Sequence, residues 1–106
     1  MSVKDFGSLF KQAQEMQSKM ADVQRDLAEK KVEVSTGGGM VKIVANGVNE
    51  IISVHIDDEL INMNDREVLE DLITGAINEV HRKVKELAQE EMTRFTGGIK
   101  IPGLFP

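Results

Sequence analysis

The sequence contains no cysteine, and its two prolines stand near the end of the chain, at positions 102 and 106. Without a thiol, disulfides, thiolate catalysis and cysteine-ligated metal sites are excluded, which fits a reducing compartment. No apolar run approaches the roughly 18 residues of a membrane span, and no basic region followed by an apolar run marks a signal peptide at the N-terminus. We therefore expect a cytoplasmic protein with no membrane partner, folded as one domain over residues 1–106.

Aromatic residues and positive charge are also scarce. The four phenylalanines fall at helix seams, helix ends or the tail, so they form no stacking platform for a single-stranded nucleic acid. Thirteen basic and eighteen acidic residues give a net charge of −5, and residues 57–71 hold one basic and seven acidic residues. The net charge argues against a nucleic-acid partner. Local basic clusters could still contact phosphates, because screening removes charges beyond about 10 Å.

The N-terminal third of the chain predicts a long helix over residues 5–30. Its apolar residues follow the 3-4 spacing of a heptad seam for about three heptads. At ~1.5 Å per residue this helix is about 39 Å long, whereas a compact chain of this length has a radius of gyration of about 13 Å. The seam must therefore meet a second helix or a second protomer. It consists of Phe6, Leu9, Ala13, Met16, Met20, Val23 and Leu27.

Residues 31–56 predict a three-stranded antiparallel sheet. Val32 and Val34 alternate with polar residues, and the glycines at 37–39 suit a turn with positive φ. Asn46-Gly47 between β-rich runs predicts a two-residue type I′ hairpin. That turn would pair Ala45 with Val48, Ile43 with Glu50, and Val41 with Ile52.

This register gives the predicted sheet two different faces. One face would be the core, formed by Val41, Ile43, Ala45, Val48, Ile52, Val54 and Ile56. The other face is mixed, and His55 on it is interpreted as a packing or interface histidine. Its small apolar patch is a plausible dimer surface. The predicted dimer interface therefore combines Met40, Val44 and Ile51 of the sheet with Met16 and Met20 of the first helix.

A second long helix is predicted over residues 65–95, with Asp65 as its N-cap. Its apolar stripe is wide at first and narrows after Val80, so the first half should pack on the sheet and the second half should be more exposed. The acidic residues between sheet and helix indicate a solvated turn rather than a cation site, because the spacing of an EF-hand calcium loop is absent. The tail, residues 96–106, either docks on the body or stays mobile.

No chemistry-bearing motif emerges from these elements. The three glycines are not followed by Lys-Ser or Lys-Thr, and a strand rather than a helix comes next, so they do not form a phosphate-binding loop. No nucleophile–base pair, metal cluster or carboxylate pair appears. We therefore expect a protein that is not an enzyme, with no metal, no cofactor and no small-molecule substrate.

Several strings together resemble the YbaB/EbfC family of small bacterial nucleoid-associated proteins. The likeness is collinear over nearly the whole chain, and no single string carries a mechanism. The strings are residues 11–17 (KQAQEMQ), 38–42 (GGMVK), 45–47 (ANG), 69–73 (LEDLI), 76–79 (AINE) and 102–105 (PGLF).

The resemblance implies an α+β fold of helix, three-stranded sheet and helix, and a homodimer with projecting helices. It also implies binding to double-stranded DNA in the cytoplasmic nucleoid, with altered DNA conformation and effects on gene expression. Phosphate contacts would come from basic residues on the projecting helices. On charge and expected projection, these are Lys11, Lys19, Arg25, Arg82, Lys83, Lys85 and Arg94.

A protein-binding adaptor or holdase is the alternative function. Long helices on a β body could present an apolar seam to a client protein, and Met16, Met20 and Met92 suit adaptable contacts. We favour the simpler interpretation that these methionines fill the core and the dimer seams. Suppressed aggregation of a client without DNA binding would favour the alternative.

Overall fold

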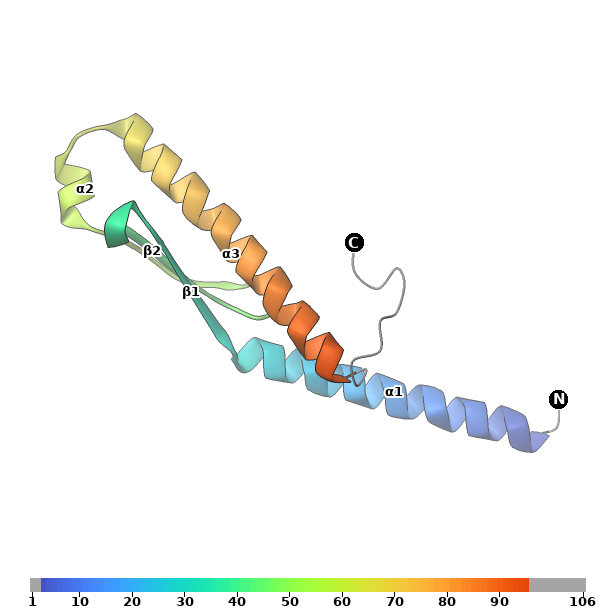
Figure 1. The fold of residues 1–106 in the computed structure, drawn as a ribbon. Helices are drawn as coiled ribbons and strands as arrows, with labels where there is room; N and C mark the ends of the chain where they lie inside the picture. Colours follow the sequence, from blue (N-terminus) through green and yellow to red (C-terminus); the bar gives the residue numbers. More distant parts are fainter. Residues whose placement is uncertain (1–2, 96–106) are drawn as a thin grey trace.

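The computed structural model describes residues 3–95 and has the predicted α+β order of helix, sheet and helix (Figure 1). The predicted tail, residues 96–106, lies outside the described residues. One short helix was not predicted, in the acidic connection, where the Asp57 side chain accepts a hydrogen bond from the Glu59 N–H at 3.0 Å. The elements are α1 (Val3–Glu29), β1 (Lys31–Thr36), the 3-10 turn η1 (Gly37–Gly39), β2 (Val41–Asn46), β3 (Ile51–Ile56), α2 (Asp58–Asn62) and α3 (Arg66–Phe95).

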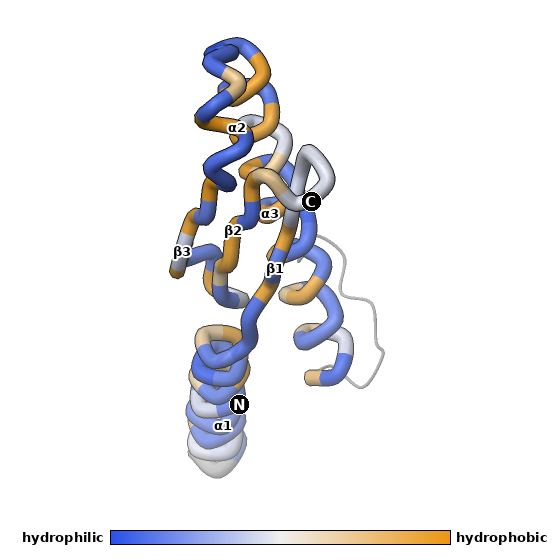
Figure 2. Tube along the Cα trace, turned by 90° about the vertical axis from the view of Figure 1, so that its left-hand side faces the viewer, coloured by the Kyte–Doolittle hydropathy of each residue, from blue (hydrophilic) through white to orange (hydrophobic). Residues whose placement is uncertain are grey.

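The three strands form an antiparallel sheet in the order β1-β2-β3, and α3 packs on β1 and β2. A helix is about 10 Å wide and strands lie about 4.8 Å apart, so one helix covers two strands and leaves the third uncovered. Figure 2 shows β3 at the edge of the sheet that α3 does not cover. The buried core consists of Val32, Val34, Val41, Ile43, Ala45, Leu60, Ala76, Val80 and Val84.

Both predicted turn regions exist, but the hairpin prediction was wrong in its register. Gly37, Gly38 and Gly39 all have positive φ, as expected. The β2–β3 connection is longer than two residues, and its positive φ lies at Asn49 (66°). The longer connection places Ala45 opposite Ile51 rather than Val48. A bulge between Val44 and Ala45 then shifts the pairing once more, so that Ile43 lies opposite Val54 and Val41 opposite Ile56.

Of the β3 residues predicted to lie in the core, Ile56 packs against it, and the prediction was wrong for the other two. Ile52 and Val54 are 51% and 52% exposed, and Ile51, which was expected on the opposite face, lies opposite Ala45. The alternation of apolar residues in β3 correctly identified an apolar surface. The pattern could not show that α3 packs on β1 and β2 and leaves this surface uncovered.

The predicted difference between the halves of α3 was wrong, because burial does not fall after Val80. Ala76 and Val80 are buried in the first half, and Val84 and Glu91 are buried in the second. The reason is that the later turns of α3 meet both the start of β1 and the end of α1 (Figure 1). The N-cap prediction is confirmed, because the Asp65 carboxylate accepts a hydrogen bond from the Val68 N–H at 3.2 Å.

The first helix projects from the body, as its length required (Figure 1). The molecule measures 72 × 23 × 19 Å, and its radius of gyration is 20.1 Å, against about 13 Å for a compact chain of this size. Val23 and Leu27 are the buried members of the seam, whereas Phe6, Leu9 and Met16 are more than half exposed. We call residues 3–18 of α1 the arm.

Candidate nucleic-acid interface

Three of the predicted DNA-contacting residues lie on one side of α1. At about 100° per residue, Lys11, Lys19 and Arg25 fall within an arc of about 120°, on the opposite side of the helix from the apolar seam. Arg25 pairs with Asp22 at 3.1 Å. Within residues 3–95, Lys11 and Lys19 have no ion pair and are exposed. Of these three residues, Lys11 and Lys19 therefore remain available to a phosphate.

The basic run of α3 is less available than its sequence suggests. Arg82 is held by Glu79 at 2.6 Å and by Glu86 at 2.9 Å. Its hydrogen bond to Glu79 raises the pKa of Arg82, and the same bond lowers the pKa of Glu79. A phosphate contact at Arg82 would have to compete with these two carboxylates.

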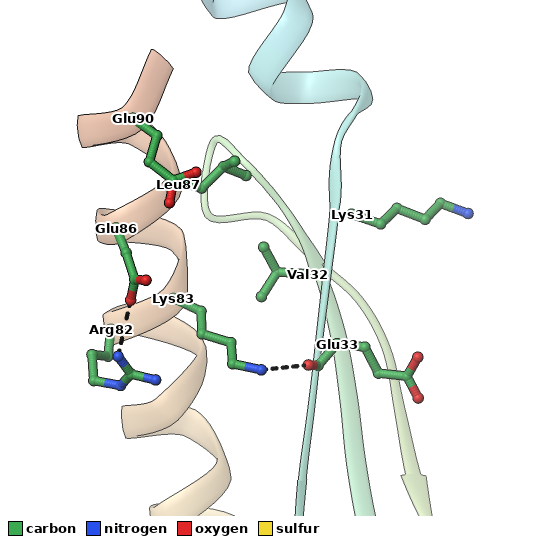
Figure 3. A pocket seen from close by; sticks show the side chains of 8 residues that line it. All are labelled: Lys31, Val32, Glu33, Arg82, Lys83, Glu86, Leu87 and Glu90. Atoms are coloured by element: carbon green, nitrogen blue, oxygen red, sulfur yellow. Dashed lines mark hydrogen bonds and ion pairs between the residues drawn. The ribbon is translucent and has the colours of Figure 1, made fainter. Parts of the chain in front are cut away.

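Lys83 lies beside the outer edge of β1, where its ammonium donates a hydrogen bond to the Glu33 carbonyl oxygen at 3.3 Å (Figure 3). A hollow of about 370 Å³ opens there between β1 and α3. Its walls balance in charge, since three basic and three acidic residues surround it with two apolar ones. They are Lys31, Val32, Glu33, Arg82, Lys83, Glu86, Leu87 and Glu90.

The three cations of this run do not share a face. A rotation of about 200° separates Lys85 from Lys83 around the helix. Lys85 is exposed and has no ion pair among the described residues. The structure therefore places Arg82, Lys83 and Lys85 in three different electrostatic settings rather than in one patch.

Arg94 pairs at 3.0 Å with Glu91, which Lys30 contacts from the end of α1. The Glu91 side chain is only 8% exposed, and its hydrogen bond from Lys30 lowers its pKa. The sequence reading missed this contact. A signal was present, because Glu91 continues the spacing of Val80, Val84 and Leu87 and so places a carboxylate on the buried stripe of α3.

The predicted dimer residues differ in exposure. Met16 and Ile51 are 55% and 49% exposed, Met20 and Val44 are half-buried, and Met40 packs against the core. The exposed apolar surface extends beyond this set. It includes Phe6 and Leu9 of the predicted seam, Phe10 beside them, and Ile52 and Val54 of β3, which were predicted to lie in the core.

The described part of the chain offers neither a metal site nor a membrane span. Residues 3–95 contain no group of three histidine or carboxylate side chains placed to hold a metal ion. Among the helices of this range, none combines the length and apolar character needed to cross a lipid bilayer.

Comparison with known proteins gives a consistent result. A nucleoid-associated protein of Desulfotalea psychrophila is 46% identical over 100 residues, covering 94% of each chain. Another, of Ruminiclostridium cellulolyticum, is 47% identical over 102 residues, covering 95% of this chain and 89% of the relative. A crystal structure of an uncharacterized protein from Helicobacter pylori shares the fold, with a TM-score of 0.75 at 23% identity over 91% of this chain and 98% of that one. The sequence matches the YbaB/EbfC DNA-binding family over residues 1–99, and the chain belongs to that family.

Proposed function

We propose that this protein binds double-stranded DNA as a homodimer in the bacterial nucleoid, chiefly through phosphate contacts, and so alters DNA conformation and influences gene expression. The observation that carries the proposal is the family match over residues 1–99. The relatives from Desulfotalea and Ruminiclostridium, both described as nucleoid-associated, support the cellular setting in the cytoplasm. Phosphate contacts supply most of non-specific DNA affinity and do not depend on base sequence.

The first helix supports the phosphate part of the proposal. Lys11 lies on the arm, which projects from the body, and Lys19 lies just beyond the arm, beside a hollow that Asp22 of α1 and Glu91 of α3 also line. Both lysines are on the side of α1 opposite the apolar seam. A second protomer that covers the seam would leave both ammonium groups free. Among the described residues, Lys85 on α3 has no ion pair and is a further cation that a phosphate can contact. The other four predicted residues would each have to give up an existing hydrogen bond or ion pair to bind a phosphate: Arg25, Arg82, Lys83 and Arg94.

The sheet supports the homodimer. A free strand edge carries unpaired backbone groups, and proteins usually protect such edges. The β1 edge is flanked by α3 and receives the Lys83 ammonium. The β3 edge has no such guard among the described residues and carries Ile51, Ile52 and Val54, each about half exposed. Pairing of two β3 edges would join two sheets and cover these side chains.

Salt-dependent titration tests the function. Two labelled duplexes of unrelated sequence are titrated with the protein and followed by fluorescence anisotropy at several salt concentrations. We expect similar affinities for both, and a log–log slope of about −0.9 per phosphate contact. Absence of binding even at low salt would overturn DNA binding for this chain.

Two matched variants test the assigned cations. The double variant Lys11→Gln/Lys19→Gln should weaken binding and flatten the salt slope by about 0.9 for each phosphate that the variant no longer neutralises. Lys31→Gln/Lys42→Gln removes the same charge from exposed positions on the sheet and serves as the control. An equal loss of DNA affinity in the two variants would mean that Lys11 and Lys19 contribute no more to DNA binding than other exposed lysines.

The exposed apolar residues of the arm favour one competing function, the protein-binding adaptor or holdase. Phe6, Leu9, Phe10 and Met16 are 52–65% exposed, and apolar surface of this kind can bind an unfolded client. Suppressed aggregation of a client, combined with no DNA binding at low salt, would support this function.

A further inference from the structure

The body holds α1 only near the C-terminal end of that helix. Val23 and Leu27 are its buried residues, and the side chains described for residues 5–19 are exposed. At ~1.5 Å per residue, Lys11 lies about 24 Å along the axis from Leu27. The direction in which the arm points therefore depends on a few contacts at this end.

One of these contacts comes from the β2–β3 connection. The Gly47 N–H donates hydrogen bonds to the carbonyl oxygens of Leu27 at 2.8 Å and Lys30 at 3.1 Å. The last carbonyl groups of a helix lack partners within the helix, so Gly47 caps α1 from a distant part of the chain. A Cβ atom at position 47 would lie 2.5 Å from the Leu27 carbonyl oxygen, so no larger residue fits without movement of the backbone.

The connection is itself held in place. The side-chain carbonyl oxygen of Asn46 accepts hydrogen bonds from the backbone N–H groups of Val48 at 3.1 Å and Glu50 at 3.0 Å. The Asn49 side chain forms a hydrogen bond with the His81 ring of α3 at 3.1 Å. Gly47 therefore lies in a loop whose conformation is stabilised by the buried Asn46 and whose Asn49 contacts α3.

A second contact joins α1 directly to α3. Glu91 accepts hydrogen bonds from Lys30, at the end of α1, and from Arg94 of its own helix. The Glu91 side chain is buried, so its charge depends on these two partners. We call Leu27, Lys30, Gly47, Glu91 and Arg94 the α1 joint.

We propose that the α1 joint is a positioning site for DNA binding: by fixing the angle between α1 and α3, it sets where the first helix presents Lys11 and Lys19. The inference rests on the proposed function. A tilt of ~10° at the joint moves Lys11 by about 4 Å, which exceeds the ~3.4 Å between successive phosphates of one strand along the DNA axis. A loosened arm would have to lose this freedom on binding, which lowers affinity.

The test compares Glu91→Gln with a matched control. Glu29→Gln removes an exposed carboxylate next to Lys30 that has no ion pair within residues 3–95. Because the chain has no cysteine, spin labels at Ser8→Cys on α1 and Asn78→Cys on α3 are specific. Labelled chains are diluted with unlabelled ones, so that the distances measured by pulsed electron spin resonance lie within one protomer.

We expect Glu91→Gln to broaden the distance distribution and to weaken DNA binding by about threefold to tenfold at constant salt, whereas Glu29→Gln leaves both unchanged. Lys30→Met should behave like Glu91→Gln, and Lys30→Arg should restore the narrow distribution. Circular dichroism confirms that each variant is folded at the temperature used.

The outcomes separate the inference from the proposed function. A narrow distribution in both Glu91→Gln and Lys30→Met would overturn the joint, even if the protein binds DNA. A broad distribution with unchanged DNA affinity would overturn its role in binding. If the wild-type protein binds no DNA, the proposed function fails, and the distance measurements alone still decide whether the joint sets the angle of α1.

Discussion

Gly47 shows how one residue can be required for a reason that its sequence context does not reveal. Asn-Gly is typical of type I′ turns, in which glycine supplies a positive φ. Here the positive φ of the loop lies at Asn49, and Gly47 is needed for space, because the Leu27 backbone occupies the position of a Cβ atom. The steric demand joins two segments that lie far apart in the chain.

Gly47→Ala should therefore destabilise the protein by about 1–3 kcal/mol, the usual cost of forcing an extra methyl group into a filled site. Gly7→Ala is the matched control. Gly7 lies in α1 with no other atom within 4 Å of a Cβ position, so alanine there should stabilise the helix by about 0.5–1 kcal/mol. Urea unfolding at one protein concentration measures both. A stable Gly47→Ala variant would show that Leu27 can move away.

At the scale of elements, the two edges of the sheet differ. The β1 edge lies beside α3, and Lys83 contacts one of its carbonyl groups. The β3 edge combines apolar side chains with an open backbone. A charged residue on an edge strand usually prevents pairing with another strand, so each edge can be tested by adding a lysine.

Val54→Lys should raise the dissociation constant of the homodimer by about tenfold or more, because a charge buried in an apolar contact lacks a partner. Ser35→Lys places the same charge at an exposed position of β1 and should leave the dimer intact. Sedimentation of both variants without DNA gives the constants. Val54 is already 52% exposed, so the protomer should stay folded. Equal dimerisation of the two variants would exclude a β3 interface.

At the scale of the whole molecule, the extended shape depends on a small area of contact. The longest dimension is 72 Å, and among the described side chains of α1 the buried ones lie in its last two turns. The charged contact between Lys30, Glu91 and Arg94 is one part of that attachment. Conditions that remove the charge of Glu91 should therefore affect stability and shape together.

The pH dependence has a definite sign. The pKa of Glu91 is lowered below its ordinary value of 4.5 in the folded protein, chiefly by the hydrogen bond from Lys30, so the folded state binds its proton less readily than the unfolded chain. The stabilisation is then complete above pH 4.5 and is lost as the pH falls through the folded pKa. The difference in free energy of unfolding between wild type and Glu91→Gln should shrink below pH 4.5. A difference independent of pH would mean that the charge of Glu91 contributes nothing.

The long helices and the three strands could be predicted from the sequence, because each depends on local patterns, whereas the short helix α2 could not. The heptad spacing from Phe6 to Leu27 predicted α1 and indicated that it is too long for the rest of the domain to cover. Asp65 marked the start of α3, and three glycines marked the turn before β2. Tertiary structure alone decided which surfaces remained open and which charges were engaged. The width of one helix left β3 uncovered, and long-range contacts placed Glu91 against Lys30 and Gly47 against Leu27. These contacts join residues distant in the chain. A local pattern can place Glu91 on the buried stripe of α3, but it cannot identify the residue that Glu91 contacts.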